Sequence, residues 1–232
     1  MNDYNLIPLG DHCAISEILK DLGLRKCSYP FDWISHTSLI HKTNLLTNVK
    51  FISELMEKHN VKDIVQKLIG TAFEPGNKKI FNNMWFPHDE GEQNDIIAKY
   101  ERRFERLYND IRNKQNIFIM LTRHTRILET DFISILSTIL SYNKNNKILF
   151  ISGSDHPYLN DPKYRGSVIF KFIFYDIKKL NKQYTIDYTQ FRPAIKEFMR
   201  ELFSKMGYTV IKSDEQPTSE QPVMTKLSLV FS

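Results

Sequence analysis

The sequence has few glycines and cysteines for its length, and it has no long apolar run. Its 232 residues include eight glycines and two cysteines. Because glycine is scarce and no glycine-rich phosphate loop is present, we expect no P-loop or dinucleotide-binding site. Two cysteines do not make a disulfide framework, and Cys-x-x-Cys and His-Glu-x-x-His spacings are missing, so we expect no metal centre. No apolar run approaches the ~20 residues of a membrane span.

The charge pattern argues against a nucleic-acid-binding protein. The net charge is +5, but the 32 basic residues are interspersed with 27 acidic ones. This pattern is typical of a solvated surface with a lysine excess, rather than of specific nucleic-acid recognition. The N-terminal residues lack the basic and apolar regions of a signal peptide, so we expect a cytoplasmic protein. The length suits one domain over residues 1–232.

Apolar runs of strand length alternate with segments of helical periodicity. The runs, which predict buried strands, cover residues 6–9, 117–121, 148–151 and 168–174, and 227–231 could add a short edge strand. Helical spacing covers residues 13–22, 93–114, 129–142 and 189–206. Continuous apolar strands linked by helices predict an α/β fold, with a parallel sheet of about four or five strands covered on both faces.

The segment between the first two strands predicts a helical insertion over about residues 34–114. Its first half, 34–72, reads as short helices, whereas residues 73–92 lose periodicity and read as a long loop, a kind of segment that often carries function. We expect the insertion to cap the carboxyl edge of the sheet. Residues 213–222 are polar and flexible in composition.

Cys13 lies at the junction between the first predicted strand and the helix that follows it. A thiol at this point is close to unpaired backbone N–H groups and to the positive end of the helix dipole, which stabilise a thiolate. The same N–H groups could hold a developing oxyanion. In open α/β sheets ligands bind at the carboxyl ends of the strands, which is where Cys13 is expected. Cys27 has no such setting, and we expect it to be structural.

Several motifs carry a resemblance to a known family. They are Leu9-Gly10-x-x-Cys13, Leu22-Gly23-Leu24-Arg25, Ser28-Tyr29-Pro30-Phe31-Asp32-Trp33, Phe86-Pro87-His88-Asp89, Lys99-Tyr100-Glu101-Arg102-Arg103-Phe104 and Phe118-Ile119-Met120-Leu121-Thr122-Arg123. Together they resemble the putative papain-like cysteine peptidase family over roughly residues 4–155. The predicted layout is more similar to Gly-Asp-Ser-Leu type hydrolases, or to polysaccharide-biosynthesis acetyltransferases with a Gly-x-Cys turn, than to true papain.

The resemblance implies roles for further residues. His88 matches the family's His-Asp element and is the implied base. Apart from the resemblance, Asp32 stands among bulky apolar residues, where an acid needs a buried partner, so it is the candidate that orients the imidazole. His156, which also follows a predicted strand, is the rival base and a further candidate for substrate contact. Asp32 could instead serve as a helix cap or turn residue.

Arginines could bind an anionic part of a ligand, because guanidinium groups form bidentate bonds to carboxylate and phosphate. Arg123 follows a strand and is the better candidate, and Arg103 is the weaker one. In the pair Arg102 and Arg103, one exposed and one salt-bridged side chain is the simpler interpretation. Trp33 is a further candidate for substrate contact.

The leading hypothesis is an enzyme that forms a thioester on Cys13 from a peptide, an ester or another acyl donor. Water as the acceptor would make it a hydrolase that needs no cofactor. A sugar or polysaccharide precursor as the acceptor would make it an acyltransferase, with coenzyme A as a possible cofactor. The remaining alternative is a catalytically inactive relative that binds a ligand.

Overall fold

The computed structural model describes residues 4–9, 13–36, 41–70, 80–81, 84–85, 89, 91–122, 126–173 and 192–211. Its central element is a four-stranded sheet in the order β1-β5-β6-β7, in which every neighbouring pair is parallel. The strands are β1 (Asn5–Pro8), β5 (Asn116–Thr122), β6 (Lys147–Ser152) and β7 (Val168–Phe172). Nearly every side chain of the first three is buried, as expected for a sheet covered on both faces. The predicted α/β fold is confirmed.

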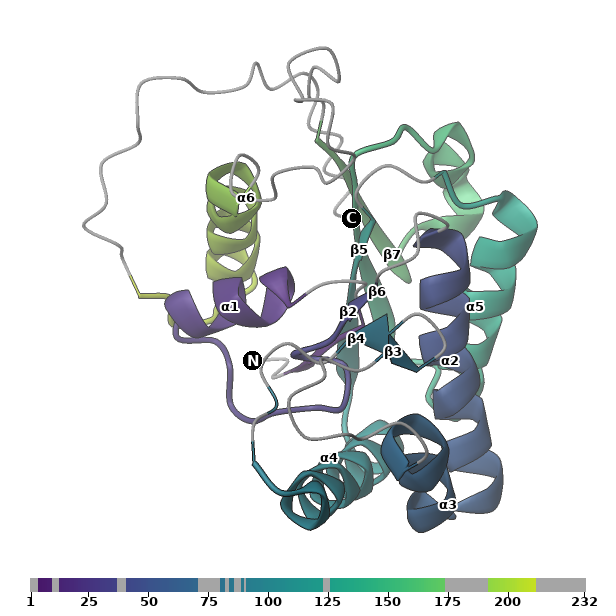
Figure 1. The fold of residues 1–232 in the computed structure, drawn as a ribbon. Coiled ribbons are helices and arrows are strands. Elements are labelled where there is room, and N and C mark those ends of the chain that lie inside the picture. The colour runs from purple at the N-terminus through teal and green to yellow at the C-terminus, as the bar shows by residue number, and fades with distance from the viewer. Residues whose placement is uncertain are drawn as a thin grey trace, which may run out of the picture.

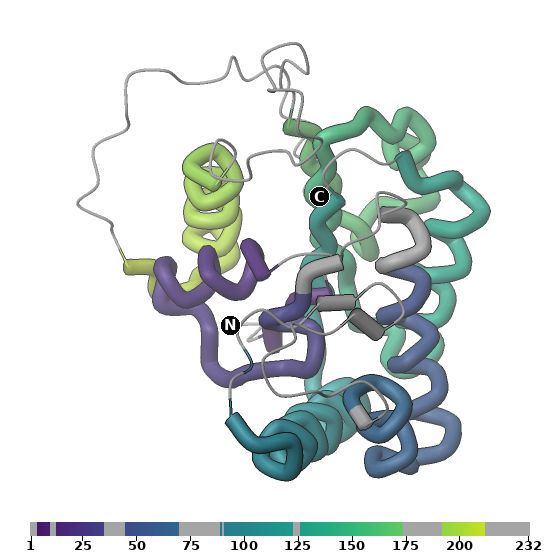
Figure 2. Tube along the Cα trace, in the orientation of Figure 1, coloured from purple at the N-terminus to yellow at the C-terminus, as the bar shows by residue number. Residues whose placement is uncertain are grey.

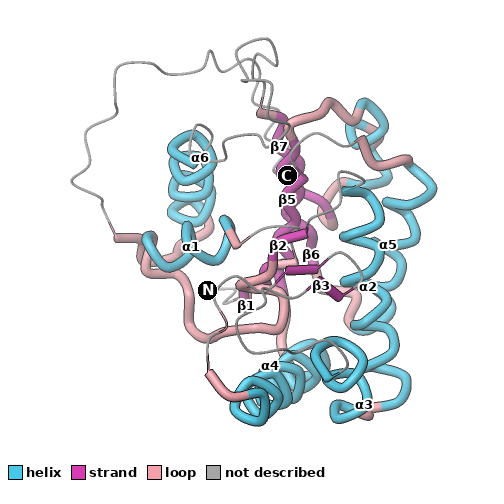
Figure 3. Tube along the Cα trace, in the orientation of Figure 1, coloured by secondary structure: helices cyan, strands magenta, loops and turns pink. Residues whose placement is uncertain are grey.

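Helices cover both faces of this sheet (Figures 1 and 3). The helices α1 (Ala14–Asp21) and α6 (Arg192–Lys205) share one face and contact each other. Figure 2 shows the two segments, from opposite ends of the chain, lying side by side. The helices α2 (His41–Lys58) and α5 (Glu129–Tyr142) lie on the other face and also contact each other. Two short 3-10 helices, Pro157–Asn160 and Pro162–Tyr164, precede β7.

The helical insertion between β1 and β5 has two further α-helices and a small sheet. It contains α2, α3 (Val61–Val65) with a following π-helical turn (Gln66–Gly70), and α4 (Gln93–Asn113). The small sheet is antiparallel in the order β2-β4-β3, with β2 (Ser35–His36), β3 (Ile80–Phe81) and β4 (Met84–Trp85). The interpretation of 73–92 as a loop was therefore wrong at β3 and β4. Strands of two residues carry no recognisable alternation of apolar side chains.

The sequence predicts that the insertion caps the carboxyl edge of the sheet. In the structure it reaches the opposite edge as well. The middle of α2 contacts the carboxyl edge, because buried Asn48 donates from Nδ2 to the Leu9 carbonyl at 3.1 Å. The body of α2 packs on α5 and β5. The end of α4 lies at the opposite, amino edge, where Asp110 contacts Asn5 and Asn116. The insertion is a layer over one face that reaches both edges.

Two of the predicted segments lie outside the described residues: the edge strand 227–231 and the flexible segment 213–222. Cys13 and Cys27 are both thiols and do not form a disulfide with each other. Among the helices in the described ranges, none is long and apolar enough to cross a membrane.

Candidate active site

Cys13 occupies the position immediately before α1. Its carbonyl accepts the first helical hydrogen bond, from the Glu17 backbone N–H at 3.1 Å. The residue is 6 % exposed, and the adjoining Ala14 and Ile15 are fully buried. This is the geometry that the apolar strand and the following helical periodicity predict. The thiol therefore lies at the positive end of a helix dipole and just beyond the carboxyl end of β1.

A carboxylate lies beside the Cys13 thiol, and an arginine binds that carboxylate. The sulfur lies 3.9 Å from Glu17 Oε1, one helical turn further along α1. A carboxylate at that distance opposes formation of a thiolate. Arg192 of α6 binds the same carboxylate, with Nη1 3.1 Å from Glu17 Oε2, and also contacts Asp21 at 2.7 Å. The guanidinium therefore offsets the charge of Glu17, so α6 takes part in setting the electrostatics around Cys13.

Asp32 is a fully buried carboxyl group held by an arginine. Arg25 donates to Asp32 Oδ2 from Nε at 3.2 Å and from Nη2 at 2.9 Å. Burial raises the pKa of Asp32 to about 6, against the opposing effect of Arg25. The other carboxylate oxygen, Oδ1, is buried and has no hydrogen-bond partner among the described residues. Asp32 thus has one fixed oxygen and one oxygen left for another donor.

Arg25 is a site residue that the sequence reasoning did not assign, although it lies inside one of the family motifs. Its Nη2 also donates to Ser28 Oγ at 2.6 Å. The guanidinium carbon lies 4.7 Å from the centre of the Trp33 ring, so Trp33 contacts Arg25 face-on. Arg25 and Asp32 are 7 positions apart, and no local sequence pattern predicts that they form an ion pair. The only hint was an acid set among bulky apolar residues, which requires a buried partner.

Arg103 is buried beside this pair, whereas Arg102 is exposed. The guanidinium carbon of Arg103 lies 4.9 Å from the centre of the Tyr100 ring. Its charge contributes to lowering the pKa of Asp32. Within the described part of the chain, its Nη1 is buried without a hydrogen-bond partner. The structure therefore brings together three of the predicted site residues, Asp32, Trp33 and Arg103.

Asp89, the residue that follows His88, belongs to the same cluster. Its carboxylate accepts from Tyr100 Oη at 2.6 Å and is ion-paired with Lys99, both on α4. The side chain of Asp89 is only 3 % exposed. Burial raises the pKa of Tyr100 well above its usual value, and the charges of Asp89 and Asp32 add to the effect. His88 itself and Arg123 lie outside the described residues.

His156 lies in a different, aromatic environment. It is fully buried, and rings of Phe150, Tyr158 and Phe170 pack around it. Its Nδ1 contacts the Ser154 carbonyl at 2.8 Å, and its Nε2 accepts from the Ile127 backbone N–H at 3.0 Å. Burial lowers the pKa of His156. Because both ring nitrogens are bonded to the backbone, the geometry favours a structural role over proton transfer.

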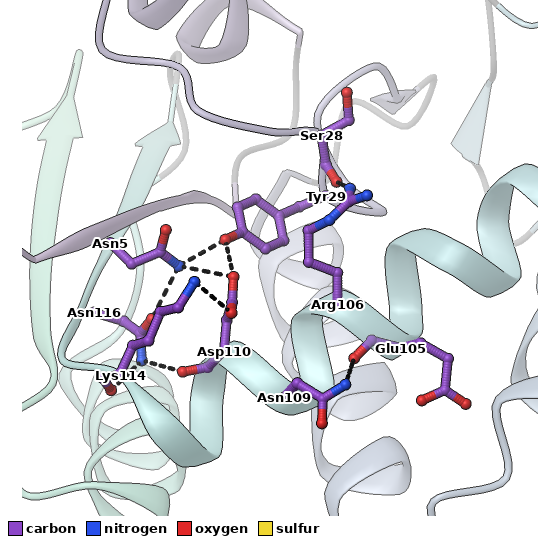
Figure 4. Close-up of polar contacts among 9 residues, drawn as sticks. All are labelled: Asn5, Ser28, Tyr29, Glu105, Arg106, Asn109, Asp110, Lys114 and Asn116. Carbon is purple, nitrogen blue, oxygen red and sulfur yellow. Dashed lines mark hydrogen bonds and ion pairs between the residues drawn. The ribbon is translucent and has the colours of Figure 1, made fainter.

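A second buried polar cluster, the amino-edge network, anchors the segment that carries Asp32 (Figure 4). Tyr29 donates to Asp110 Oδ2 at 2.5 Å, and Asn5 Nδ2 donates to the Tyr29 hydroxyl at 2.6 Å. Lys114 Nζ lies 2.8 Å from the other oxygen of Asp110. Asn116 joins Asn5 at 3.1 Å, which ties the starts of β1 and β5 together. Burial, then the bond to Asp110, raises the pKa of Tyr29 far above its usual range.

Comparison with known proteins is consistent with these motifs. A family model described as putative papain-like cysteine peptidase matches residues 4–151. No curated protein and no solved structure matches the chain. The matched segment runs from the start of β1 to β6, so it contains Cys13, Asp32 and Arg103 as well as the whole helical insertion. The chain therefore belongs to the putative papain-like cysteine peptidase family.

Proposed function

We propose that this protein is a cysteine hydrolase in which Cys13 is the nucleophile, His88 the base and Asp32 the group that orients the imidazole. The observation that carries the proposal is the placement of Cys13. It precedes α1 directly and lies at the carboxyl end of β1 in a parallel sheet. This is the edge at which open α/β sheets bind ligands, and a helix start stabilises the charge of a thiolate.

The reaction follows from these groups. His88 takes the thiol proton, and the Cys13 sulfur attacks the carbonyl carbon of a peptide or ester. The tetrahedral intermediate collapses to a thioester on Cys13, and the amine or alcohol departs with the proton from His88. Water, deprotonated by His88, then attacks the thioester, which releases the acid and restores the thiol. The first two backbone N–H groups of α1 are the natural donors to the oxyanion.

Two features of the Asp32 cluster support this assignment. Arg25 fixes Asp32 Oδ2, and no other described residue bonds the buried Oδ1, which is therefore available to accept from an imidazole N–H. Asp89, adjacent to His88 in the chain, is bonded to Tyr100, which also carries the Arg103 guanidinium over its ring. The residue next to His88 is therefore bonded to α4, the helix that also carries Arg103 close to Asp32.

Intact-protein mass spectrometry after incubation with activated esters and peptide thioesters tests the nucleophile. We expect one acyl adduct on Cys13, lost in Cys13→Ala and kept in Cys27→Ala, the matched control. Iodoacetamide at pH 6.5 should likewise modify Cys13 before Cys27, because a thiolate reacts and a thiol does not. Faster labelling of Cys27, or an adduct that survives in Cys13→Ala, would contradict the proposal.

The base is tested by three variants. His88→Ala should abolish turnover and slow alkylation of Cys13, whereas Asp32→Asn should mainly reduce the rate of turnover by releasing the ring. His156→Ala is the control and should leave Cys13 alkylation unchanged if the protein stays folded. A changed alkylation rate in His156→Ala but not in His88→Ala would reassign the base. Adding sugars and coenzyme A thioesters to the reaction distinguishes a transferase from a hydrolase.

A further inference from the structure

The ion pairs around Asp32 leave one buried positive charge without a matching carboxylate. Arg25 is paired with Asp32, and Lys99 is paired with Asp89. Arg103 is 8 % exposed, and among the described residues it forms no ion pair at hydrogen-bonding distance. Its guanidinium instead lies over the face of the Tyr100 ring. Arg103 is therefore the unmatched cation of this cluster.

An unmatched buried guanidinium is costly, so its presence needs a reason. Burying an ion without a partner costs several kcal/mol, and replacing such an ion by an apolar side chain is often stabilising. The neighbouring arginine on the same face of α4, Arg106, is half-buried and donates to the Ser28 carbonyl. Arg102 is exposed. Of these three arginines, only Arg103 combines burial with an unpartnered donor.

We propose that Arg103 binds a carboxylate of the ligand, with Nη1 as a donor to it. The site has a charged side chain that is more than nine-tenths buried and whose free nitrogen needs an acceptor. A carboxylate supplies both the acceptor and the missing negative charge, and a guanidinium is the donor that matches its planar shape. That this ligand is the substrate rests on the proposed function, whereas the binding itself does not.

The charges around Arg103 favour a monoanion over a phosphate dianion. Asp32 lies close enough to interact electrostatically with Arg103, and its Oδ1 is unpaired. A second negative charge brought to this position would be repelled by Asp32, whereas a single one is balanced by Arg103. The substrate class that follows is a peptide or N-acyl amino acid with a free carboxylate, rather than a phosphorylated one.

The chain offers a matched pair of variants for the test, Arg103→Met and Arg102→Met. In the ligand-free protein, we expect Arg103→Met to raise the melting temperature by about 2–4 °C, because an unpaired buried charge is replaced by an apolar side chain. At constant ionic strength, N-acetylglycine should stabilise the wild type and Arg102→Met, but not Arg103→Met. Inorganic phosphate and N-acetylglycine amide should give little or no stabilisation.

Each other outcome overturns the proposal. A lower melting temperature for Arg103→Met, with an unchanged response to N-acetylglycine, would make Arg103 a structural residue. Equal stabilisation by phosphate would show a general anion site, and equal stabilisation by the amide would show that the carboxylate is not recognised. Loss of the response in Arg102→Met as well would place the anion on the surface of α4.

The same experiment in Cys13→Ala separates the two proposals. If Cys13→Ala still responds to N-acetylglycine while the wild type forms no acyl adduct, the carboxylate site stands and the hydrolase proposal fails. If adducts form, the KM for substrates with a free carboxylate should rise about 10–100-fold in Arg103→Met, the range expected for one charge-assisted hydrogen bond. Amidated substrates should show no such change, and a uniform loss for both would contradict the site.

Discussion

The amino-edge network and the Asp32 cluster join the same two parts of the chain, yet they differ in how completely their polar groups are paired. Both connect residues 25–32 to α4, through Tyr29 and Asp110 in one case and through Asp32 and Arg103 in the other. Asp110 and Arg103 are two helical turns apart and both buried. In the network, each carboxylate oxygen of Asp110 has a partner. In the cluster, Asp32 and Arg103 each have a buried atom with no hydrogen-bond partner in the described ranges.

The difference indicates different tasks for two neighbouring sites. Buried polar groups in a folded protein are nearly always hydrogen-bonded, because an unpaired one costs ~1–3 kcal/mol. The amino-edge network follows this rule and fixes the strands β1 and β5 to α4. The Asp32 cluster breaks the rule at two atoms of opposite charge, which is the arrangement expected of a site that is completed by a catalytic partner or by a ligand.

Asp110→Ala should give the largest effect on stability. It leaves the Tyr29 hydroxyl, the Asn5 amide and the Lys114 ammonium without their shared acceptor, so we expect a loss of about 3–5 kcal/mol in the free energy of unfolding. Urea denaturation measures it. Asn109→Ala is the control on the exposed side of the same helix and should stay within about 0.5 kcal/mol of the wild type. A loss below 1 kcal/mol for Asp110→Ala would remove the distinction between the two clusters.

Asp32→Asn should change how stability depends on pH. The folded-state pKa of about 6 is above the ordinary value of 3.8, so the folded protein holds a proton that the unfolded chain releases. The wild type should therefore lose about 2 kcal/mol relative to Asp32→Asn as the pH rises from 4 to 7. The lost Arg25 contact changes the offset between the two curves and not this slope.

Urea midpoints measured across this pH range give the slope. Asp21→Asn is a control of opposite sign, because Arg192 and Lys196 lower the pKa of the more exposed Asp21. Its wild-type carboxylate adds stability as the pH rises, by a small amount at this exposed position. If the difference in the free energy of unfolding between the wild type and Asp32→Asn does not change with pH, the pKa of Asp32 is not raised in the folded protein.

Tyr29→Phe should give the smallest of these effects, a loss of about 1–2 kcal/mol at neutral pH. The variant removes one hydroxyl but leaves Asp110 paired with Lys114 and contacted by Asn5. Tyr142→Phe removes a single bond from a half-buried hydroxyl to Ser53 and serves as the reference. If both variants lower the free energy of unfolding by the same amount, burial of the Tyr29–Asp110 hydrogen bond adds no stability.

Local pattern was enough to predict the main sheet and the long helices. The bounds predicted for α5, residues 129–142, are those observed, because apolar periodicity and an acidic first turn coincide there. The continuous apolar runs predicted β5 and β6 because both strands are buried on two faces. The position of Cys13 before α1 followed from the break between two such patterns. These features depend on neighbours in the sequence.

The polar clusters depend on distant residues, so the sequence indicated Asp32 and Arg103 as candidates but predicted neither their partners nor the amino-edge network. Tyr29 and Asp110 are separated by 81 positions, and no local pattern joins them. Asn48 carried a recoverable signal, since it lies on the face of α2 that is otherwise apolar. The motif containing Arg103 was recognised, but which of the two adjacent arginines is buried depends on the rotation of α4 against Phe31 and Tyr29. The predicted base His88 stays a prediction.

The contact between the two ends of the described chain has a consequence for synthesis on the ribosome. Tyr208 donates to the Tyr4 carbonyl across 204 positions, and Ile211 donates its backbone N–H to Leu22. One face of the central sheet is covered by α1 together with α6, whose residues are made late. Until α6 emerges, a nascent chain that has already formed β1, β5 and β6 exposes the apolar side chains that α6 will cover. A stalled or truncated chain that lacks α6 therefore presents an apolar binding surface for chaperones.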